Sequence, residues 1–312
     1  MSGSEPPLLP ADDAGIARAA ALLRAGELVA VPTETVYGLA ARADCEAAVA
    51  SIFRAKDRPD FNPLIVHVAS LEMARALARF DARAEALAAR YWPGPLTLVV
   101  PSRQSAVVPA VTAGLRTLAL RMPDHPATRR LLEEVALPLA APSANRSGTV
   151  SPTEPAHVAR SLGGRVAAIL DGGACRRGLE STIVALREDG GWQLLRPGPI
   201  PGEELAALLG PPSELVDAGI EAPGQLARHY APGKPLRLGA TEADEDEFLI
   251  GFGPVAGDCS LSRDGDLALA AARLYACLHL AAASGKPRIA VAPVPEQGIG
   301  AAINDRLRRA AA

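Results

Sequence analysis

Short apolar runs alternate with amphipathic stretches along the first 200 residues of this chain. Residues 12–25 repeat apolar positions at helical spacing, and the apolar run 27–31 follows them. A second helical pattern over 44–55 precedes an apolar run at 64–68, and Ser70 is placed to cap the next helix. These spacings predict helices alternating with buried strands. Further strands are expected over residues 95–100, 117–122, 137–142, 166–170, 181–186 and 192–196.

The composition changes after residue 209, where prolines and glycines replace periodic apolar positions. Residues 210–234 leave little room for a helix or a paired strand, so we expect a linker there. An acidic run at 242–247 is expected to be a solvated loop. The remaining patterns predict strands over 248–252 and 288–292 and helices over 266–284 and 300–309. We therefore predict an α/β fold with a mixed sheet in domain 1–209, a linker at 210–234, and a smaller α/β domain at 235–312.

The overall composition fits a globular protein and narrows the chemistry. Of 312 residues, 49% are apolar and 21% charged, and no apolar run is long enough to span a membrane. The first residues lack the features of a secretory signal, so we expect a cytoplasmic location. Four cysteines and five histidines show no metal-ligand spacing, and we expect no metal held by the protein. A net charge of −3 requires any nucleic-acid contact to be a local basic patch.

Lysine is rare here, with three among the 32 lysines and arginines, at positions 56, 234 and 286. Lys56 lies between Arg54 and Arg58 at the end of a predicted helix. A compact ammonium beside a guanidinium suits phosphate oxygens, but cations are equally common at solvated helix ends. Both readings stay open.

Three other features carry polar groups at predicted strand ends. Arg121 on an apolar strand needs a carboxylate or phosphate partner, which is either a ligand or a structural salt bridge. His67 within an apolar strand is either a ligand or a core residue. The small hydroxyl and amide side chains of 141–148 suit an anion or a ribose, and equally an ordinary turn.

Together, a series of motifs resembles the YrdC-like family of L-threonylcarbamoyl-AMP synthases. They are PTETVYGL at 32–39, KDR at 56–58, PLIVH at 63–67, WPGPLT at 92–97, RMP at 121–123 and PSAN at 142–145. HYAP at 229–232 and AINDRL at 302–307 resemble the two-domain form of the family. Residues 222–225 depart from the Ser-Pro-Gly pattern expected there. The resemblance implies a YrdC-like twisted mixed open sheet with helices and a smaller Rossmann-like C-terminal domain.

The resemblance also implies a reaction in which L-threonine, bicarbonate and ATP give threonylcarbamoyl-AMP and pyrophosphate, with magnesium held mainly through the triphosphate. The product feeds the tRNA threonylcarbamoyl-transfer machinery, and direct tRNA binding is left open. Lys56 and Arg58 are the implied catalytic cations. The implied threonine-binding residues are Thr35, His67, Arg121, Ala141 and Ser181. The implied ATP-binding residues are Arg58, Asn62, Thr117, Ser143, Asn145, Ser151, Arg196, His229 and Tyr230.

Two alternatives compete with this interpretation. A binder of structured RNA would use the arginines around Lys56 and Arg121 against phosphates, but the acidic balance and the lack of interleaved aromatic residues disfavour it. A carbamoyl-transfer relative from hydrogenase maturation would add an acylphosphatase-like domain and paired-cysteine zinc motifs, which this sequence lacks.

Overall fold

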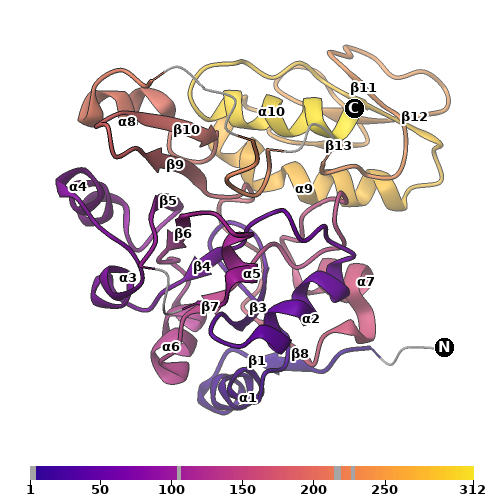
Figure 1. The fold of residues 1–312 in the computed structure, drawn as a ribbon. Coiled ribbons are helices and arrows are strands. Elements are labelled where there is room, and N and C mark those ends of the chain that lie inside the picture. Colours follow the sequence, from indigo (N-terminus) through magenta and orange to yellow (C-terminus); the bar gives the residue numbers. More distant parts are fainter. Residues whose placement is uncertain (1–4, 104–106, 214–218, 226–228) are drawn as a thin grey trace.

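Two sheets organise the computed structural model, which describes residues 5–103, 107–213, 219–225 and 229–312 (Figure 1). The larger sheet has the strand order β1-β8-β2-β3-β7-β4-β6-β5-β9-β10. Its strands are β1 (Leu8–Pro10), β2 (Val29–Val31), β3 (Gly38–Arg42), β4 (Ile65–His67), β5 (Leu96–Pro101), β6 (Thr117–Arg121), β7 (Leu139–Ala140), β8 (Ala168–Asp171), β9 (Thr182–Leu186) and β10 (Trp192–Arg196). Parallel pairs such as β4·β6 and antiparallel pairs such as β5·β6 confirm the predicted mixed sheet.

Helices cover both faces of this sheet because alternate residues of its strands point to opposite sides. Val29 and Val31 of β2 pack with α1 and α6, whereas Ala30 packs with α2 and its neighbours. The helices are α1 (Asp13–Arg24), α2 (Glu46–Lys56), α3 (Leu71–Leu77), α4 (Ala82–Tyr91), α5 (Pro109–Thr112), α6 (Pro126–Val135), α7 (Pro155–Leu162), the 3₁₀ turn η1 (Gly163–Arg165) and α8 (Gly202–Leu209). Ser70 caps α3 as predicted, because its side chain accepts a hydrogen bond from the backbone of Met73.

The smaller unit is a parallel sheet with the order β11-β14-β12-β13. It comprises β11 (Leu236–Leu238), β12 (Glu247–Gly251), β13 (Cys259–Ser260), β14 (Arg288–Val291), α9 (Leu267–Ala283) and α10 (Ile299–Ala311). Figure 1 shows this unit, in orange and yellow, lying along one side of the larger sheet, with α9 at the contact.

The two units share a hydrophobic cluster rather than touching at their edges. Val36, Val150 and Leu179 of the larger unit pack with Tyr230 and with the core around α9. Gly178 lets α9 approach closely: its φ is +68°, and a Cβ there would lie 2.5 Å from the backbone of Ala272. The small unit is therefore packed firmly against the face that carries the site.

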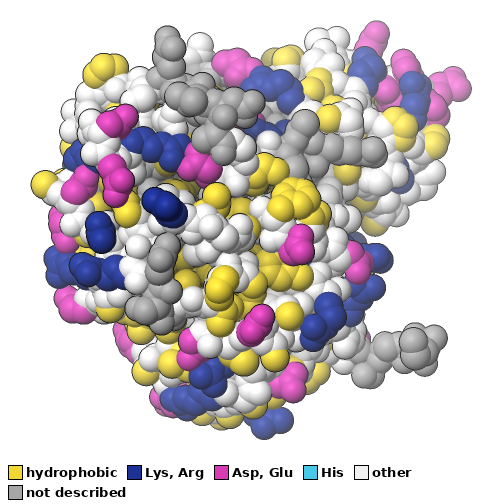
Figure 2. Space-filling view, in the orientation of Figure 1, with side chains coloured by type: hydrophobic (Ala, Val, Ile, Leu, Met, Phe, Trp, Pro, Cys, Tyr) yellow, Lys and Arg dark blue, Asp and Glu magenta, His cyan; other side chains and the backbone are white. Residues whose placement is uncertain are grey.

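Each helix and strand predicted from the pattern has a counterpart, but the short strands β1, β11 and β13 were not predicted, and two further details differ. β3 was not predicted, because its sequence Gly-Leu-Ala-Ala-Arg lacks the β-branched residues that mark strands. The expected acidic loop ends at residue 246: Glu247 begins β12, is buried, and pairs with Arg237 at 2.5 Å. Figure 2 shows exposed acidic side chains mixed with basic ones over this part of the small unit. Arg288 pairs with Asp244 and Asp246.

We retain the division into 1–209, 210–234 and 235–312 as a proposal. The end of α8 at Leu209 and the start of β11 at Leu236 support it. Residues 214–218 and 226–228 of the proposed linker lie outside the described residues.

Candidate active site

A small cavity lies where the strand ends of the larger sheet meet the segment before the small unit. Its volume is about 40 Å³, which is room for water molecules rather than for a nucleotide. The larger unit contributes Thr33, Val36, Gly38, Arg58, Ile65, His67, Arg121, Ala141, Pro142, Ser143, Glu180 and Arg196. The segment that leads to the small unit contributes Pro223, Gly224, His229 and Tyr230. The cavity thus gathers most of the predicted site residues from positions distant in sequence.

Three buried cations, Lys56, Arg58 and Arg196, have no carboxylate partner among the described residues. Arg58 and Arg196 line this cavity, whereas Lys56 is not one of its lining residues. Arg58 donates only to the backbone carbonyls of Asn62 and Pro63, the latter at 3.0 Å. Arg196 donates to the Ser181 carbonyl at 3.0 Å, and also to the Ser181 hydroxyl and the Pro223 carbonyl. Lys56 Nζ donates to two carbonyl oxygens, those of Ser143 and Asn145, at 2.5 Å each. Within the described ranges, no ion pair neutralises any of the three.

Burial lowers the pKa of each of these groups. Burial, together with the charge of Arg58, holds the pKa of Lys56 well below its usual value. Burial and the nearby charge of Arg196 lower the pKa of Arg58 to about 10. Arg196 also has a lowered pKa, with burial as the main cause. An anion bound among these side chains restores favourable conditions for all three positive charges, so the site is suited to a polyanion.

The turn after β7 wraps around the end of α2 and brings the PSAN motif to Lys56. Ser147 N donates to the Lys56 carbonyl at 2.8 Å, and Asn145 Nδ2 donates to the Arg146 and Thr149 carbonyls. Asn145 Oδ1 is buried, with no hydrogen-bond partner among the described residues. An unsatisfied buried acceptor beside the cavity is available to a ligand donor.

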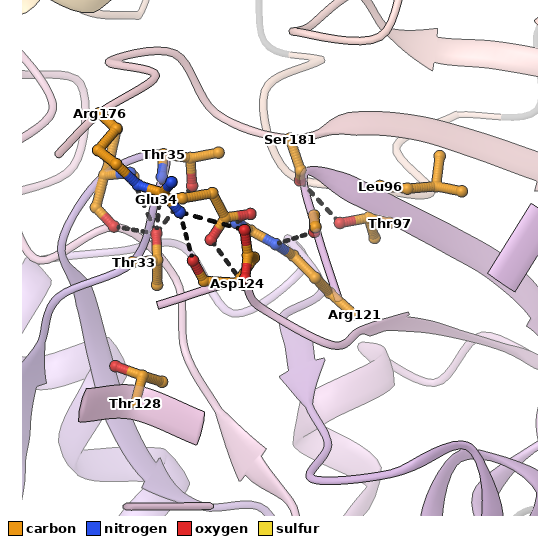
Figure 3. A network of polar contacts seen from close by, with 12 residues as sticks. Thr33, Glu34, Thr35, Leu96, Thr97, Arg121, Asp124, Thr128, Arg176 and Ser181 are labelled. Carbon is orange, nitrogen blue, oxygen red and sulfur yellow. Dashed lines mark hydrogen bonds and ion pairs between the residues drawn. The ribbon is translucent and has the colours of Figure 1, made fainter. Parts of the chain in front are cut away.

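Arg121 has the salt-bridge partner that the sequence left open as one of two alternatives. Its Nη2 lies 2.6 Å from Glu34 Oε1, and both side chains are buried. Asp124 N donates to the other carboxylate oxygen of Glu34 at 2.9 Å, as Figure 3 shows. Arg121 nevertheless lines the cavity, whereas Glu34 is not one of its lining residues. Glu34 therefore holds the guanidinium from behind and leaves Arg121 facing the cavity.

His67 faces the same cavity next to Arg121, its register partner on β6. Burial, aided by the charge of Arg121, holds the pKa of His67 well below its ordinary value. The imidazole is therefore neutral near pH 7, and it can donate or accept a hydrogen bond without adding charge.

Hydroxyl groups complete this end of the cavity (Figure 3). Thr33 Oγ1 accepts from the backbone of Thr35 and Val36 and lies 2.9 Å from Thr35 Oγ1. Ser181 Oγ lies 2.7 Å from Thr97 Oγ1 and accepts from Arg196. Thr35 and Ser181 thus adjoin lining residues but do not themselves line the cavity.

On the opposite wall, His229 and Tyr230 enclose the cavity. Their rings meet edge to face, with centroids 4.1 Å apart. Burial lowers the pKa of His229 to about 3, and its Nδ1 has no partner in the described part of the chain. Gly224 allows this wall to come close, because its φ is +89° and a Cβ there would lie 2.8 Å from Arg196 Cδ.

Four predicted ATP-binding residues, Asn145 among them, are not on the cavity surface. Ser151 lies behind it and donates to Glu180 Oε1 at 2.6 Å. Asn62 is buried beside Arg58, with Oδ1 unpartnered among the described residues. Thr117 is farther away: it begins β6, whereas Arg121 ends that strand, and it lines a separate surface cavity of about 710 Å³ with Arg79, Arg103 and Arg116.

Glu180 is a lining residue that the sequence did not single out. Burial alone would raise its pKa, but Arg306 and Arg196 bring it down to about 2, so the carboxylate is ionised. Its position directly before the predicted Ser181 was the available signal. Its partners on α9 and α10 lie about 100 residues away in sequence and could not be read from any local pattern.

The structure is an α/β protein with buried cations at its cavity, and known proteins share this architecture. Residues 21–198 match the Sua5/YciO/YrdC family, described as telomere recombination. Residues 200–312 match the C-terminal domain of threonylcarbamoyl-AMP synthase. The chain therefore belongs to the threonylcarbamoyl-AMP synthase family, in its two-domain form.

Individual relatives agree over nearly the whole chain. The threonylcarbamoyl-AMP synthase of Bacillus subtilis is 42% identical, covering 97% of this chain and 94% of that protein. The Pyrococcus abyssi synthase is 43% identical, covering 94% and 92%. The crystal structure of P. abyssi Sua5 complexed with L-threonine matches with a TM-score of 0.89 at 38% identity, covering 97% of both chains. Among the described residues, no helix is both long and apolar enough to cross a bilayer.

Proposed function

We propose that this protein is an L-threonylcarbamoyladenylate synthase, which converts L-threonine, bicarbonate and ATP into threonylcarbamoyl-AMP and pyrophosphate. The observation that carries this proposal is the set of three buried cations, Lys56, Arg58 and Arg196, that have only neutral oxygen partners. Burying an unpaired charge costs several kcal/mol, about as much as breaking a buried ion pair. A bound anion would offset this cost for the three side chains. A polyphosphate matches them in charge and geometry.

The threonine half of the site is proposed at Arg121. The guanidinium pairs with the amino acid's carboxylate while Glu34 fixes its orientation. Neutral His67, the Ala141 carbonyl and the hydroxyls of Thr35 and Ser181 are the proposed partners of the amine and side chain. P. abyssi Sua5, which resembles this chain over its whole length, forms a complex with L-threonine.

The nucleotide half is proposed along the facing wall. Lys56 and Arg58 lie toward the reacting phosphates, and Arg196 extends the cationic surface. The remaining proposed ATP contacts are Asn62, Ser143, Asn145, Ser151, His229 and Tyr230. We leave Thr117 out of this set, because it lines a different cavity at the other end of β6.

The proposed chemistry needs alignment and charge stabilisation. The threonine amine attacks bicarbonate-derived carbon and gives a carbamate with loss of water. A carbamate oxygen then attacks the α-phosphorus, and pyrophosphate leaves. Negative charge develops on the phosphoryl oxygens beside Lys56 and Arg58, where buried cations stabilise it most. Holding the reactants together removes a barrier of up to about 7–11 kcal/mol in well-oriented systems, and we assign no dedicated base.

A magnesium ion bound to the triphosphate would neutralise part of its charge. Over the described residues, no group of three or more His, Cys, Asp or Glu side chains could hold a metal ion. The protein side chains at the cavity are mainly cationic, so they fit the triphosphate rather than the ion. No step of the proposed chemistry therefore uses a metal ion held by the protein.

Access for ATP requires a movement, because the cavity is far smaller than the nucleotide. We propose that the wall formed by Pro223, Gly224, His229 and Tyr230 opens to admit ATP and then closes. Closure would shield the carbamate and the mixed anhydride from water. These four residues thus act as a lid in this proposal.

Two further parts of the proposal concern the cellular context. The product would pass to the tRNA threonylcarbamoyl-transfer machinery, and a cytoplasmic location suits that role. Binding of RNA phosphates by the same arginines is disfavoured, because Lys56, Arg58 and Arg121 are buried. The exposed Arg146 and Arg176 already pair with aspartates.

The test is mass-spectrometric detection of threonylcarbamoyl-AMP after incubation of the purified protein with ATP, threonine and bicarbonate. Product should require all three substrates and appear with equimolar pyrophosphate. Arg58→Ala should reduce its formation at least about a hundredfold, because a charge-assisted contact in the transition state is lost. Arg54→Ala, an exposed arginine four residues away, is the matched control and should retain activity. Wild-type protein that yields no adenylate contradicts the proposed function.

A further inference from the structure

Arg306, in the AINDRL motif of α10, is completely buried and reaches out of the small unit toward the cavity. Its Nε donates to Glu180 Oε2 at 2.9 Å, and its Nη2 donates to the Pro197 carbonyl at 2.9 Å. Its guanidinium carbon lies 5.2 Å from the centroid of the Tyr230 ring. Asp305 accepts the remaining contact, from Nη1, at 2.5 Å. A single guanidinium therefore joins three separate segments.

These three segments are all parts of the cavity wall. Glu180 and Tyr230 line the cavity, and Pro197 directly follows the lining residue Arg196. The lining residues end at Tyr230, so the small unit reaches the cavity through such contacts rather than by facing it. Arg306 is thus placed to set the geometry of the site without touching a ligand.

The carboxylate of Glu180 is the group that this contact controls most directly. Oε1 accepts from Ser151, and Oε2 accepts from both Arg306 and Tyr275, whose hydroxyl lies at 2.8 Å. The three donors come from α9, from α10 and from Ser151. The charged and titratable groups that face Glu180 are Arg306 and Asp305 of α10, Tyr275 of α9, Arg196 of β10, and His229 and Tyr230.

A free carboxylate in this cavity would be harmful to nucleotide binding. Arg196 lies close enough to lower the pKa of Glu180, yet its donors contact Ser181 and Pro223 instead. Without its partners on the small unit, the Glu180 carboxylate could rotate toward Arg196 and compete with phosphate for the cation.

We propose that Arg306 is a positioning residue for the nucleotide half of the site, because it holds the Glu180 carboxylate against α9 and α10 and so reserves Arg196 for the polyphosphate of ATP. This inference rests on the proposed function. It also gives the small unit a role. Glu180 carries the one carboxylate among the described residues that line the cavity, and Arg306 of α10 keeps it out of the phosphate position.

The test compares Arg306→Gln with Arg308→Gln, a control on the same helix whose side chain is exposed and pairs with Glu296. Arg306→Gln should raise KM for ATP at least about tenfold, because a buried charge-assisted contact is lost, with a much smaller change in KM for threonine. The control should match the wild type.

The selectivity of the effect separates positioning from a general loss of structure. A merely structural defect would raise KM for ATP and KM for threonine by similar factors. Similar factors for the two substrates overturn the proposal.

The double variant Arg306→Gln/Glu180→Gln gives a second, independent readout. It removes the competing charge, so KM for ATP should return to within about threefold of the Glu180→Gln single variant, which is the coupling expected of contacting residues. No such recovery overturns the proposal. If Arg306→Gln alone does not fold, Arg306→Lys replaces it: lysine keeps the charge but cannot reach Glu180 and Pro197 together, and an unchanged KM for ATP then counts against the inference.

Failure of the proposed function is recognised separately. In that case the wild-type protein makes no adenylate, and ATP binding measured by titration calorimetry on the same variants reports on Arg306. Loss of ATP affinity in Arg306→Gln, recovered in the double variant, supports the positioning role even then. Equal ATP affinity in all variants contradicts it.

Discussion

Two buried ion pairs flank the cavity, and they face it in opposite senses. In the pair Arg121–Glu34, the guanidinium lines the cavity and the carboxylate lies behind it. In the pair Arg306–Glu180, the carboxylate lines the cavity and the guanidinium lies behind it. In the proposed function, the first arrangement presents a cation to the threonine carboxylate. The second restrains an anion beside the proposed phosphate site.

The two pairs also differ in what they connect. Arg121 ends β6, and Glu34 follows β2, so the first pair lies entirely within the larger unit. Glu180 precedes β9 and Arg306 belongs to α10, so the second pair joins the two units. Burying either pair costs desolvation energy that the contact only partly offsets. In the proposed function, the first pair therefore serves ligand binding directly, and the second makes the site depend on docking of the small unit.

Arg121→Met should break the first pair and give the largest effect. Loss of the cation leaves Glu34 buried and unpaired, which should lower the free energy of unfolding by about 3–5 kcal/mol. Loss of the carboxylate clamp should also raise KM for threonine more than a hundredfold, because charge-assisted hydrogen bonding worth roughly 3 kcal/mol is lost. Denaturant titration and steady-state kinetics with threonine as the varied substrate measure the two effects.

Arg121→Met/Glu34→Met is the matched control for stability. Removing both charges should recover much of the lost unfolding free energy, because no uncompensated buried charge remains. Threonine binding should stay impaired, since the clamp is still absent. A double variant with normal KM for threonine would exclude Arg121 from the threonine site.

Acidification tests the second pair, and we expect an effect of intermediate size on the free energy of unfolding. The pKa of Glu180 is about 2 in the folded protein and 4.5 for the free side chain. Because the folded value is depressed, this carboxylate stabilises the fold fully above pH 4.5, and the contribution disappears as the pH falls toward 2. Its size is on the order of 3 kcal/mol.

Glu180→Gln should be less stable than wild type at pH 7, since Arg306 loses its partner, but it should lose less stability on acidification. Chemical denaturation at pH 6, 4 and 3 gives the comparison, and the difference between the two proteins isolates Glu180 from other carboxylates. Parallel pH profiles for wild type and variant would show that the pair does not couple protonation to folding.

The sequence predicted the parts of the site that local pattern specifies. Arg58, Ser143 and Arg196 follow apolar runs or helices, and the strands then bring their ends together at one edge, as expected for α/β sheets. Contacts that depend on tertiary approach were not predictable. Glu180 meets Arg306 only because α10 packs on the larger unit, and Thr117 is separated from Arg121 by the length of β6.

The same distinction explains the buried Glu247 and the missed β3. The sequence predicts the run 242–247 as an acidic loop, yet the pairing of β12 with β14 places its last residue, Glu247, in the small sheet. β3 forms because β2 and β7 provide hydrogen-bonding partners on both sides, although its own residues have low strand propensity. Pairing partners decided the structure at both positions, and these lie outside any local window.

Tyr275→Phe should give the smallest effect and sharpen the comparison further. It removes one of three donors to Glu180 and leaves Arg306 and Ser151 in place, so the carboxylate stays ionised and held. Losing one buried hydrogen bond should cost about 1–2 kcal/mol of unfolding free energy. Tyr91→Phe is the control, because the Tyr91 hydroxyl makes only an exposed 3.4 Å contact with Glu204 and should cost under about 0.5 kcal/mol. KM for ATP should rise slightly in Tyr275→Phe, and KM for threonine should not change. An equal rise in both constants would mean that the small unit acts on the whole cavity rather than on the nucleotide half.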